Sequence, residues 1–193
     1  PVLMNSLPPF RRPAKVLDSS GPTEVPPTRN ETARICTWPL PESDFPDVSD
    51  SETDPFWALW EIEAAYDAGI VQGYPNGNYG PSDPVSRAQM AVYIARAMVT
   101  PSGDAAIHVP SGVVEPTFND VDAEHWAYRY IEYCAANGIV QGYPGGGYHP
   151  DEVVNRGQMA VYVARAVADP IGDAGVPEVP AGTPPTFTDV TAD

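Results

Sequence analysis

Basic residues are scarce in this chain of 193 residues, which has a single lysine, Lys15. Lysines and arginines number 10 in total against 26 aspartates and glutamates, and the formal net charge at pH 7 is −16. This balance argues against nucleic acid as a partner, because binding to phosphates needs clustered Lys and Arg side chains. An acidic surface with little lysine suits an extracellular or envelope protein, and it equally occurs in many other soluble proteins.

Long hydrophobic runs are also absent. No stretch of apolar residues is long enough to span a membrane, and no secretory signal peptide is visible. The sequence starts at Pro1 without a methionine, which predicts a processed or excerpted segment and leaves secretion open.

Cysteine is rare, and the two cysteines are Cys36 and Cys134. In an oxidising compartment they predict one disulfide across about a hundred residues, a loop closure that stabilises a fold by several kcal/mol in the chain-entropy model. The alternative, equally open, is that Cys134 fills a small apolar position of the core and that Cys36 is free. Asn30 begins the sequon Asn-Glu-Thr and is a candidate glycosylation site.

Patterns typical of catalysis are missing as well. The histidines, His108, His125 and His149, do not have the spacing of metal ligands, and no nucleophile–base pair stands out. We therefore predict a noncatalytic chain without a cofactor. The acidic stretch 47–54 (DVSDSETD) is dense in oxygen ligands and suggests Ca²⁺ as an alternative, although it lacks the glycine and the terminal glutamate of an EF-hand loop.

What the chain has in place of these features is a repeat. Residues 69–98 return as residues 138–167, at a constant offset that also relates Arg87 to Arg156. The sequence PTFNDV at 116–121 then reappears as PTFTDV at 185–190. Repeats of this kind cannot each bury a shared face alone, so a third copy that is begun and not finished predicts apolar surface in need of a partner.

The domain organisation follows from this register. Residues 1–44 are rich in proline with little periodicity and predict an extended arm, with a disordered linker as the alternative. Residues 45–116 are predicted to form a first repeat with its connector and residues 117–185 a second. Residues 186–193 begin the third.

Each repeat has the pattern of a helix, a glycine-rich loop, a second helix and a connector. In the second copy, apolar residues from Trp126 to Ala135 recur at helical spacing, with Asp120 or Asp122 as the expected N-cap. Ser86 and Asn155 are the expected N-caps of the second helix in the two repeats.

Two further expectations concern the ends of the repeats. The last helix is predicted to bury one stripe of side chains, formed by Met159, Ala160, Val163, Ala166 and Val167. The connector 104–116 (DAAIHVPSGVVEP) mixes β-branched residues with proline and glycine, which predicts a short strand or hairpin.

The motifs of the two copies occur in the order FxDV, WA, GIVQGYPxGxY and [SN]R[AG]QMAVYxARA. This series resembles the S-layer homology repeat over residues 45–98 and 118–167, with the start of a third copy at Phe187. The resemblance implies a mainly α fold of tandem helix-loop-helix repeats around a shared helical core, with irregular connectors. It also implies an extracellular role on a prokaryotic cell surface, where the module anchors proteins by binding cell-wall polysaccharide.

In that family the ligand is met by the arginine of a Thr-Arg-Ala-Glu motif, which implies saccharide binding by Arg87 and Arg156. Here glutamine replaces the glutamate in both copies, at Gln89 and Gln158, so each arginine loses an acidic neighbour. The other candidates for saccharide binding lie in the matched motifs and are Trp57, Trp126, Tyr74, Tyr143, Gln72 and Gln141.

Structural roles remain open for these residues. The loop tyrosines suit stacking on sugar rings, and they equally suit pinning the loop to the helix pair. Arg87 and Arg156 are alternatively structural, by capping helix carbonyls or by pairing with Asp47 or Asp120.

A second function also remains open, in which the chain is a self-assembling structural subunit of a surface layer, a sheath or an extracellular filament. The proline-rich arm and the unfinished third repeat are the segments expected to contact neighbouring copies in such a polymer.

Overall fold

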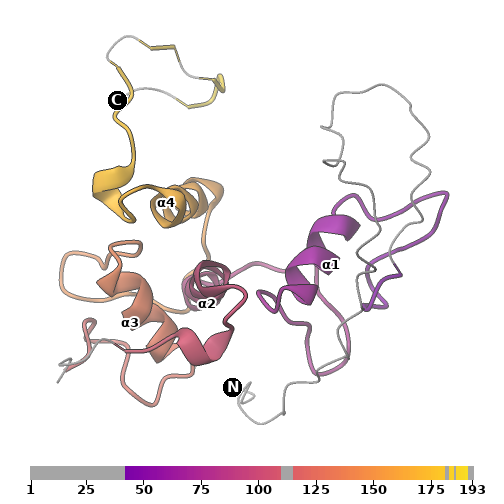
Figure 1. Ribbon diagram of the computed structural model, residues 1–193, viewed down its shortest axis with the longest axis horizontal. Coiled ribbons are helices and arrows are strands. Elements are labelled where there is room, and N and C mark those ends of the chain that lie inside the picture. Colours follow the sequence, from indigo (N-terminus) through magenta and orange to yellow (C-terminus); the bar gives the residue numbers. More distant parts are fainter. Residues whose placement is uncertain (1–41, 110–114, 181–182, 185, 191–193) are drawn as a thin grey trace.

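The computed structural model describes residues 42–109, 115–180, 183–184 and 186–190. Most of the predicted arm, with Cys36 and Asn30, lies outside these residues. The elements in chain order are α1 (Leu59–Asp67), α2 (Arg87–Val99), η1 (Asp104–Ala106), α3 (Tyr128–Ala136), α4 (Arg156–Val167) and η2 (Asp173–Gly175) (Figure 1). The described residues form no sheet, only an isolated antiparallel bridge between Ser86 and Val153. The prediction of a mainly helical fold is therefore confirmed.

The second helix of each repeat starts at a capping box, as predicted for Ser86 and Asn155. The Ser86 hydroxyl accepts from the Gln89 amide at 3.2 Å, and the Ser86 amide donates to Gln89 Oε1 at 2.9 Å. Asn155 and Gln158 exchange the same two bonds at 2.9 and 3.0 Å. Glutamine at the third helical position therefore completes the box as glutamate would.

The first helix of each repeat starts differently from the prediction. Helix α3 follows Ala127 without any side-chain cap, so the expected caps Asp120 and Asp122 are wrong. The Asp120 carboxylate accepts from the amides of Tyr148 and His149 at 2.7 and 2.8 Å. The Asp120 carboxylate therefore binds the glycine-rich loop and not the helix. A turn closed by the bond from His125 N to Asp122 O separates Asp120 from the start of α3.

Helix α2 is the centre of the structure and packs against both α3 and α4 (Figure 1). Its buried face includes three small residues, Ala88, Ala91 and Ala95, which are fully buried. Small side chains let the α3 backbone approach closely, so that the Cys134 thiol lies 3.5 Å from the carbonyl oxygen of Ala91. The core of the molecule thus joins a helix of the first repeat to a helix of the second.

Helix α1 lies apart from this core (Figure 1) and has a small cluster of its own. The cluster contains Phe45, Val48, Leu59 and Ile62, with Tyr79 from the glycine-rich loop packed against it. Phe118 and Val121, which repeat Phe45 and Val48, belong instead to the main core. The two repeats thus share a sequence and differ in what surrounds their first helix.

The predicted buried stripe of α4 is wrong. Met159, Val163 and Val167 are 40%, 42% and 77% exposed, whereas Met90 and Ile94, the counterparts of the first two in α2, are buried. The sequence pattern is the same in both helices. The difference arises because α3 covers this face of α2, and no described residue covers it on α4.

The connector begins with a turn of 3-10 helix, and its described residues, 104–109 and 115–116, contain no strand. The rest of the predicted strand or hairpin, residues 110–114, lies outside the described residues. Arg96 holds η1 through Asp104, with Nε to Oδ1 at 2.9 Å, and Arg165 holds η2 through Asp173 in the same way at 3.0 Å. The repeating unit therefore includes these connector turns as structural parts.

Candidate functional site

A groove lies where the two repeats meet. Residues of α2 and of the first loop form one side, and the start of the second repeat forms the other. The residues that line it are Gln72, Gln89, Val92, Tyr93, Arg96, Trp126 and Tyr130. We call this surface the inter-repeat groove. Of the residues predicted to bind a saccharide, it brings together Gln72 and Trp126.

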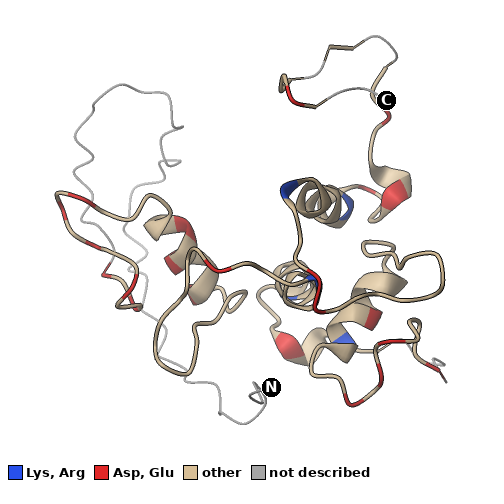
Figure 2. Ribbon diagram, turned by 180° about the vertical axis from the view of Figure 1, so that it is seen from behind, with Lys and Arg blue, Asp and Glu red and all other residues tan. Residues whose placement is uncertain are grey.

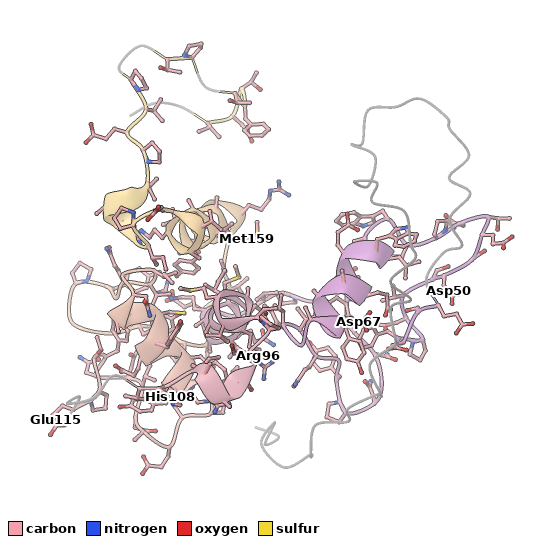
Figure 3. The ribbon with its side chains drawn as sticks, in the orientation of Figure 1. Asp50, Asp67, Arg96, His108, Glu115 and Met159 are labelled. Atoms are coloured by element: carbon pink, nitrogen blue, oxygen red, sulfur yellow. The ribbon has the colours of Figure 1, made fainter. Side chains whose placement is uncertain are left out.

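A charged cluster closes one end of the inter-repeat groove, at the end of α2 near η1, where Figure 3 labels Arg96. Asp104 accepts from Arg96 Nε at 2.9 Å, from Tyr130 Oη at 2.7 Å and from Arg129 Nη2 at 3.1 Å. Burial raises the pKa of Asp104, but the hydrogen bonds from Arg96 and Tyr130 outweigh it and hold this pKa below its usual value. The cluster therefore stays ionised, and Arg96 Nη1 makes no hydrogen bond to a described residue.

Aromatic and amide groups form the rest of the groove. The Trp126 indole is 37% exposed and stacks on His125, with ring centroids 5.7 Å apart. Gln89 also lines the groove, and its side chain uses its oxygen in the capping box, which leaves its side-chain nitrogen without a hydrogen bond to a described residue. A flat apolar ring beside amide donors and a guanidinium is the kind of surface that carbohydrates fit.

Arg87 is enclosed by the second repeat and is only 4% exposed. Its Nε donates to Tyr148 O at 2.7 Å, its Nη1 to Tyr162 Oη at 2.6 Å and its Nη2 to Gln141 O at 3.1 Å. The guanidinium carbon also lies 4.5 Å from the centre of the Tyr148 ring. We call these three acceptors the Arg87 cage. The alternative of pairing with Asp47 or Asp120 is wrong, because both carboxylates accept loop amides.

Arg156 has the opposite environment, although it occupies the same position of the repeated motif. It is exposed, and it makes no hydrogen bond or ion pair with any residue that the structure describes. The reason lies in the order of the repeats, because the groups that enclose Arg87 all come from the repeat that follows it.

Comparison with known proteins shows the family of the two repeats. The family model of the S-layer homology domain matches residues 44–91 and 117–160. The chain carries two S-layer homology repeats. Such domains bind cell-wall polymers and are themselves noncatalytic, and they occur in proteins of the bacterial cell surface.

Relatives of the chain include cell-surface proteins of two bacteria. It is 28% identical over 127 residues to Cell surface glycoprotein 1 of Acetivibrio thermocellus, covering 65% of this chain and 5% of the relative. It is 27% identical over 124 residues to the Cellulosome-anchoring protein of the same organism, covering 64% and 26%. It is 28% identical over 122 residues to S-layer protein EA1 of Bacillus anthracis, covering 63% and 13%. The chain thus spans only a small part of each relative, and another relative is an endoglucanase of a Bacillus species.

The remaining residues predicted to bind a saccharide lie around the loops of the two S-layer homology repeats. Tyr143 is 36% exposed, lies 4.9 Å from the Arg87 guanidinium and donates to Glu152 at 3.2 Å. The backbone of Gln141 belongs to the Arg87 cage. Tyr74 lines a second pocket, and Trp57 on the surface beside α1 is 73% exposed. Saccharide contact by these four residues stays a prediction.

The loop in each S-layer homology repeat is pinned by its FxDV segment, a role that the sequence did not reveal. Asp47 and Asp120 accept two loop amides each, and Phe118 packs on the buried Tyr148 ring at 5.1 Å. Gly142 permits this packing, because a Cβ there would lie 2.7 Å from Phe118 Cε1. The constant spacing of these residues was the available signal.

A buried glutamate in the first helix of each repeat was also missed. Glu132 is 1% exposed, and its two oxygens accept from the Thr117 amide at 2.8 Å and the Thr117 hydroxyl at 2.6 Å. In the first repeat, Glu63 Oε1 accepts from the Ser43 hydroxyl and from the Asp44 backbone amide, both at 3.0 Å. These carboxylates tie the segment before FxDV to the helix, and their recurrence at the same position of both repeats was the signal for it.

The cysteine and calcium predictions have different outcomes. Cys134 is a free and fully buried thiol, and burial raises its pKa to about 12. In the described part of the chain, no group of three or more His, Cys, Asp or Glu side chains is arranged to hold a metal ion. In the stretch 47–54, Asp47 is used by the loop and Asp50 accepts from the Ser43 amide. None of the helices described is long and apolar enough to cross a membrane.

Proposed function

We propose that this chain anchors a protein at the bacterial cell surface by binding a cell-wall polysaccharide in the inter-repeat groove. The observation that carries the proposal is the composition of this groove, in which Trp126, Gln89 and Arg96 from two successive S-layer homology repeats face one binding surface. The name of one relative, a cellulosome-anchoring protein, supports the anchoring role.

Each group of the groove has a task in this proposal. The exposed face of Trp126 stacks on a sugar ring, as flat apolar surfaces do in carbohydrate sites. The amides of Gln72 and Gln89 bond sugar hydroxyls. Arg96 meets an acidic substituent through Nη1, and a charged hydrogen bond of this kind contributes roughly 1.5–3 kcal/mol.

The two motif arginines take unequal parts. Arg87 has a structural part, because its donors are used inside the Arg87 cage. Arg156 is the exposed member of the pair, so its guanidinium is accessible to a ligand in solution. The net charge of −16 favours a polysaccharide with few acidic groups, although salt screens this repulsion beyond about 10 Å.

Sedimentation with cell walls tests the proposal. The full chain is mixed with isolated bacterial cell-wall sacculi that retain their polysaccharide and with sacculi from which it has been stripped chemically. We expect co-sedimentation with the first only, and loss of it in Trp126→Ala. Trp60→Ala is the matched control, because Trp60 is 49% exposed on α1 and does not line the groove.

Two results would overturn this function. One is equal sedimentation with stripped and intact sacculi. The other is a Trp126→Ala chain that binds intact sacculi as well as the unaltered chain does, with circular dichroism showing that both are folded.

A further inference from the structure

The contact between α2 and α3 shows how the second helix of one repeat packs against the first helix of the next. We call this contact the template. Cys134 of α3 contacts Ala91 of α2, and the same buried cluster contains Met90 and Ile94 of α2 and Ala127, which directly precedes α3. Helix α4 repeats the α2 sequence and exposes its matching face. Helix α1 repeats the place of α3 and leaves its own face open.

The open face of α1 is seen by comparing equivalent positions. Ala127, directly before α3, and Cys134 within it are fully buried, whereas their counterparts Ala58, directly before α1, and Ala65 within it are only half-buried. Tyr130 is buried, and its counterpart Glu61 is exposed. Helix α4 therefore has a face like that of α2 with no counterpart of α3 against it among the described residues. Helix α1 likewise has a face like that of α3 with no counterpart of α2 against it among these residues.

The first repeat also carries the parts of a second arginine cage. The Arg87 cage consists of Gln141 O, Tyr148 O and Tyr162 Oη. Their counterparts in the first repeat are Gln72, Tyr79 and Tyr93, and these three line one pocket. We call this pocket the arginine socket; its other lining residues are Tyr74, Gly80, Pro81, Asp83, Pro84, Val85 and Gln89.

The backbone around the socket matches as well. The amides at the start of α2 donate across the repeats, from Arg87 N to Glu152 O at 2.8 Å and from Ala88 N to Pro150 O at 2.9 Å. The counterparts of these two acceptors are Asp83 and Pro81, and both line the socket. At the start of α4, the amides of Arg156 and Gly157 have no hydrogen bond to any described residue.

We propose that the arginine socket of one copy of this chain receives Arg156 of a second copy, so that α4 of the second copy packs on α1 of the first. The contact reproduces the one between α2 and α3. Arg156 enters among Gln72, Tyr79 and Tyr93, and the first turn of α4 bonds to the backbone of Pro81 and Asp83.

Charge supports this pairing. Helix α4 carries its basic residues, Arg156 and Arg165, near its two ends, and α1 carries acidic residues (Figure 2). Asp83, the counterpart of Glu152, adds a carboxylate to the lining of the socket. Glu61 takes the place of Tyr130 and comes opposite Arg165, as Tyr130 Oη lies opposite Arg96 Nη2 at 3.4 Å.

The proposed contact joins two different surfaces, so each copy keeps one socket and one Arg156 for further neighbours. A heterologous contact of this type produces a closed ring or an open chain of subunits, according to the rotation between copies. It does not depend on polysaccharide, so it stands or falls separately from the anchoring function.

Sedimentation velocity of the full chain without saccharide is the first test. We expect reversible association that strengthens with concentration up to about 1 mM, and at least a tenfold weaker association for Arg156→Ala, which corresponds to about 1.4 kcal/mol. Tyr93→Phe, which removes one acceptor of the socket, weakens association less. Arg129→Ala is the control, because it makes the same change of charge outside both faces.

A disulfide trap identifies which surfaces touch. Ala65 and Ala160 are the counterparts of Cys134 and Ala91, which are in contact in the template. In a Cys36→Ser background, chains with Ala65→Cys are mixed with chains with Ala160→Cys. We expect a disulfide between the two chains under mild oxidation, and at least a tenfold lower initial yield when Arg156→Ala is added.

Three results would overturn the proposal. The first is a chain that stays monomeric over the whole concentration range. The second is association that Arg156→Ala leaves unchanged although the variant is folded. The third is a trap that closes only within single chains carrying both cysteines at high dilution, which would assign the socket to the same copy.

Discussion

The Nε atom of Arg87 donates to the carbonyl oxygen of Tyr148 at 2.7 Å, so a side chain of the first S-layer homology repeat fixes the loop of the second. Arg87 and Tyr148 are 61 residues apart in sequence. In return, the Tyr148 hydroxyl donates to the carbonyl oxygen of Arg87 at 3.0 Å. This reciprocal pair makes the boundary between the repeats a part of the core.

The two motif arginines are therefore expected to differ in their effect on stability. Arg87→Ala leaves buried oxygens of Tyr148, Gln141 and Tyr162 without their donor, and we expect it to lower the free energy of unfolding by about 3 kcal/mol. Arg156→Ala changes an exposed side chain, and at protein concentrations too low for association the loss should stay within about 0.5 kcal/mol. Urea unfolding followed by tryptophan fluorescence measures both. Equal losses would contradict the assignment of Arg87 to the core.

Protonation of Asp120 at low pH should weaken its hydrogen bonds to the second loop. Burial raises the pKa of Asp120, but the amide hydrogen bonds from Tyr148 and His149 prevail and hold this pKa below its usual value. A carboxylate with a lowered pKa in the folded state contributes stability above its unfolded pKa of about 3.9 and loses it as the pH falls through the folded value. The free energy of unfolding should therefore fall below about pH 4.

The Asp120→Asn variant tests this source of the pH dependence. Asparagine cannot accept from both loop amides, so we expect lower stability at pH 7 and a shallower loss on acidification. Asp122→Asn is the matched control, since the Asp122 carboxylate makes no hydrogen bond to a described residue. Urea unfolding from pH 7 to pH 3 gives both curves. Parallel curves for Asp120→Asn and the unaltered chain would refute the assignment.

The Cys134 thiol should react only when the fold opens. It is fully buried and its pKa is raised to about 12, so little thiolate is present or accessible at pH 8. In a Cys36→Ser chain, we expect slow labelling by a thiol reagent under native conditions and complete labelling in urea. Fast native labelling, at the rate of the unfolded chain, would show that α3 does not cover this residue.

Glu132 is expected to stabilise the second repeat through Thr117. Glu132→Ala removes both acceptors from the Thr117 amide and hydroxyl, and we expect a loss of about 2 kcal/mol in the free energy of unfolding. Glu132→Gln keeps one acceptor for the amide and offers a donor to the rotatable hydroxyl, so its loss should be smaller. Thermal unfolding followed by circular dichroism ranks the three chains. A glutamine variant as unstable as the alanine variant would indicate that the charge itself is required.

Much of the architecture could be predicted from local patterns. Ser86 and Asn155 were recognised as N-caps because a capping box needs only neighbours three residues away. The connector was recognised as part of the repeat because Arg96 and Asp104 recur as Arg165 and Asp173. Each of these features is settled within one repeat.

The failures concern contacts between residues that are far apart in the sequence. Met159 and Val163 have the periodicity of a buried stripe, but burial is decided by whether a helix lies opposite, and periodicity is silent on that. Asp120 has the residue type of an N-cap and is used by a loop 28 residues later. Arg87 occupies the motif position that predicts saccharide binding, but its burial depends on contacts with the second repeat, among them one with Tyr162, 75 residues away.

The enclosure of Arg87 gives the chain a direction of assembly. During synthesis from the N-terminus, Arg87 is made before Tyr148 and Tyr162. The loop of the second repeat therefore packs around an arginine that has already been synthesised. A segment that is to be grafted onto another protein should therefore start at Ser86, the N-cap of α2. A segment that starts at residue 117, where the second sequence repeat begins, would contain the second loop without Arg87, whose guanidinium binds that loop.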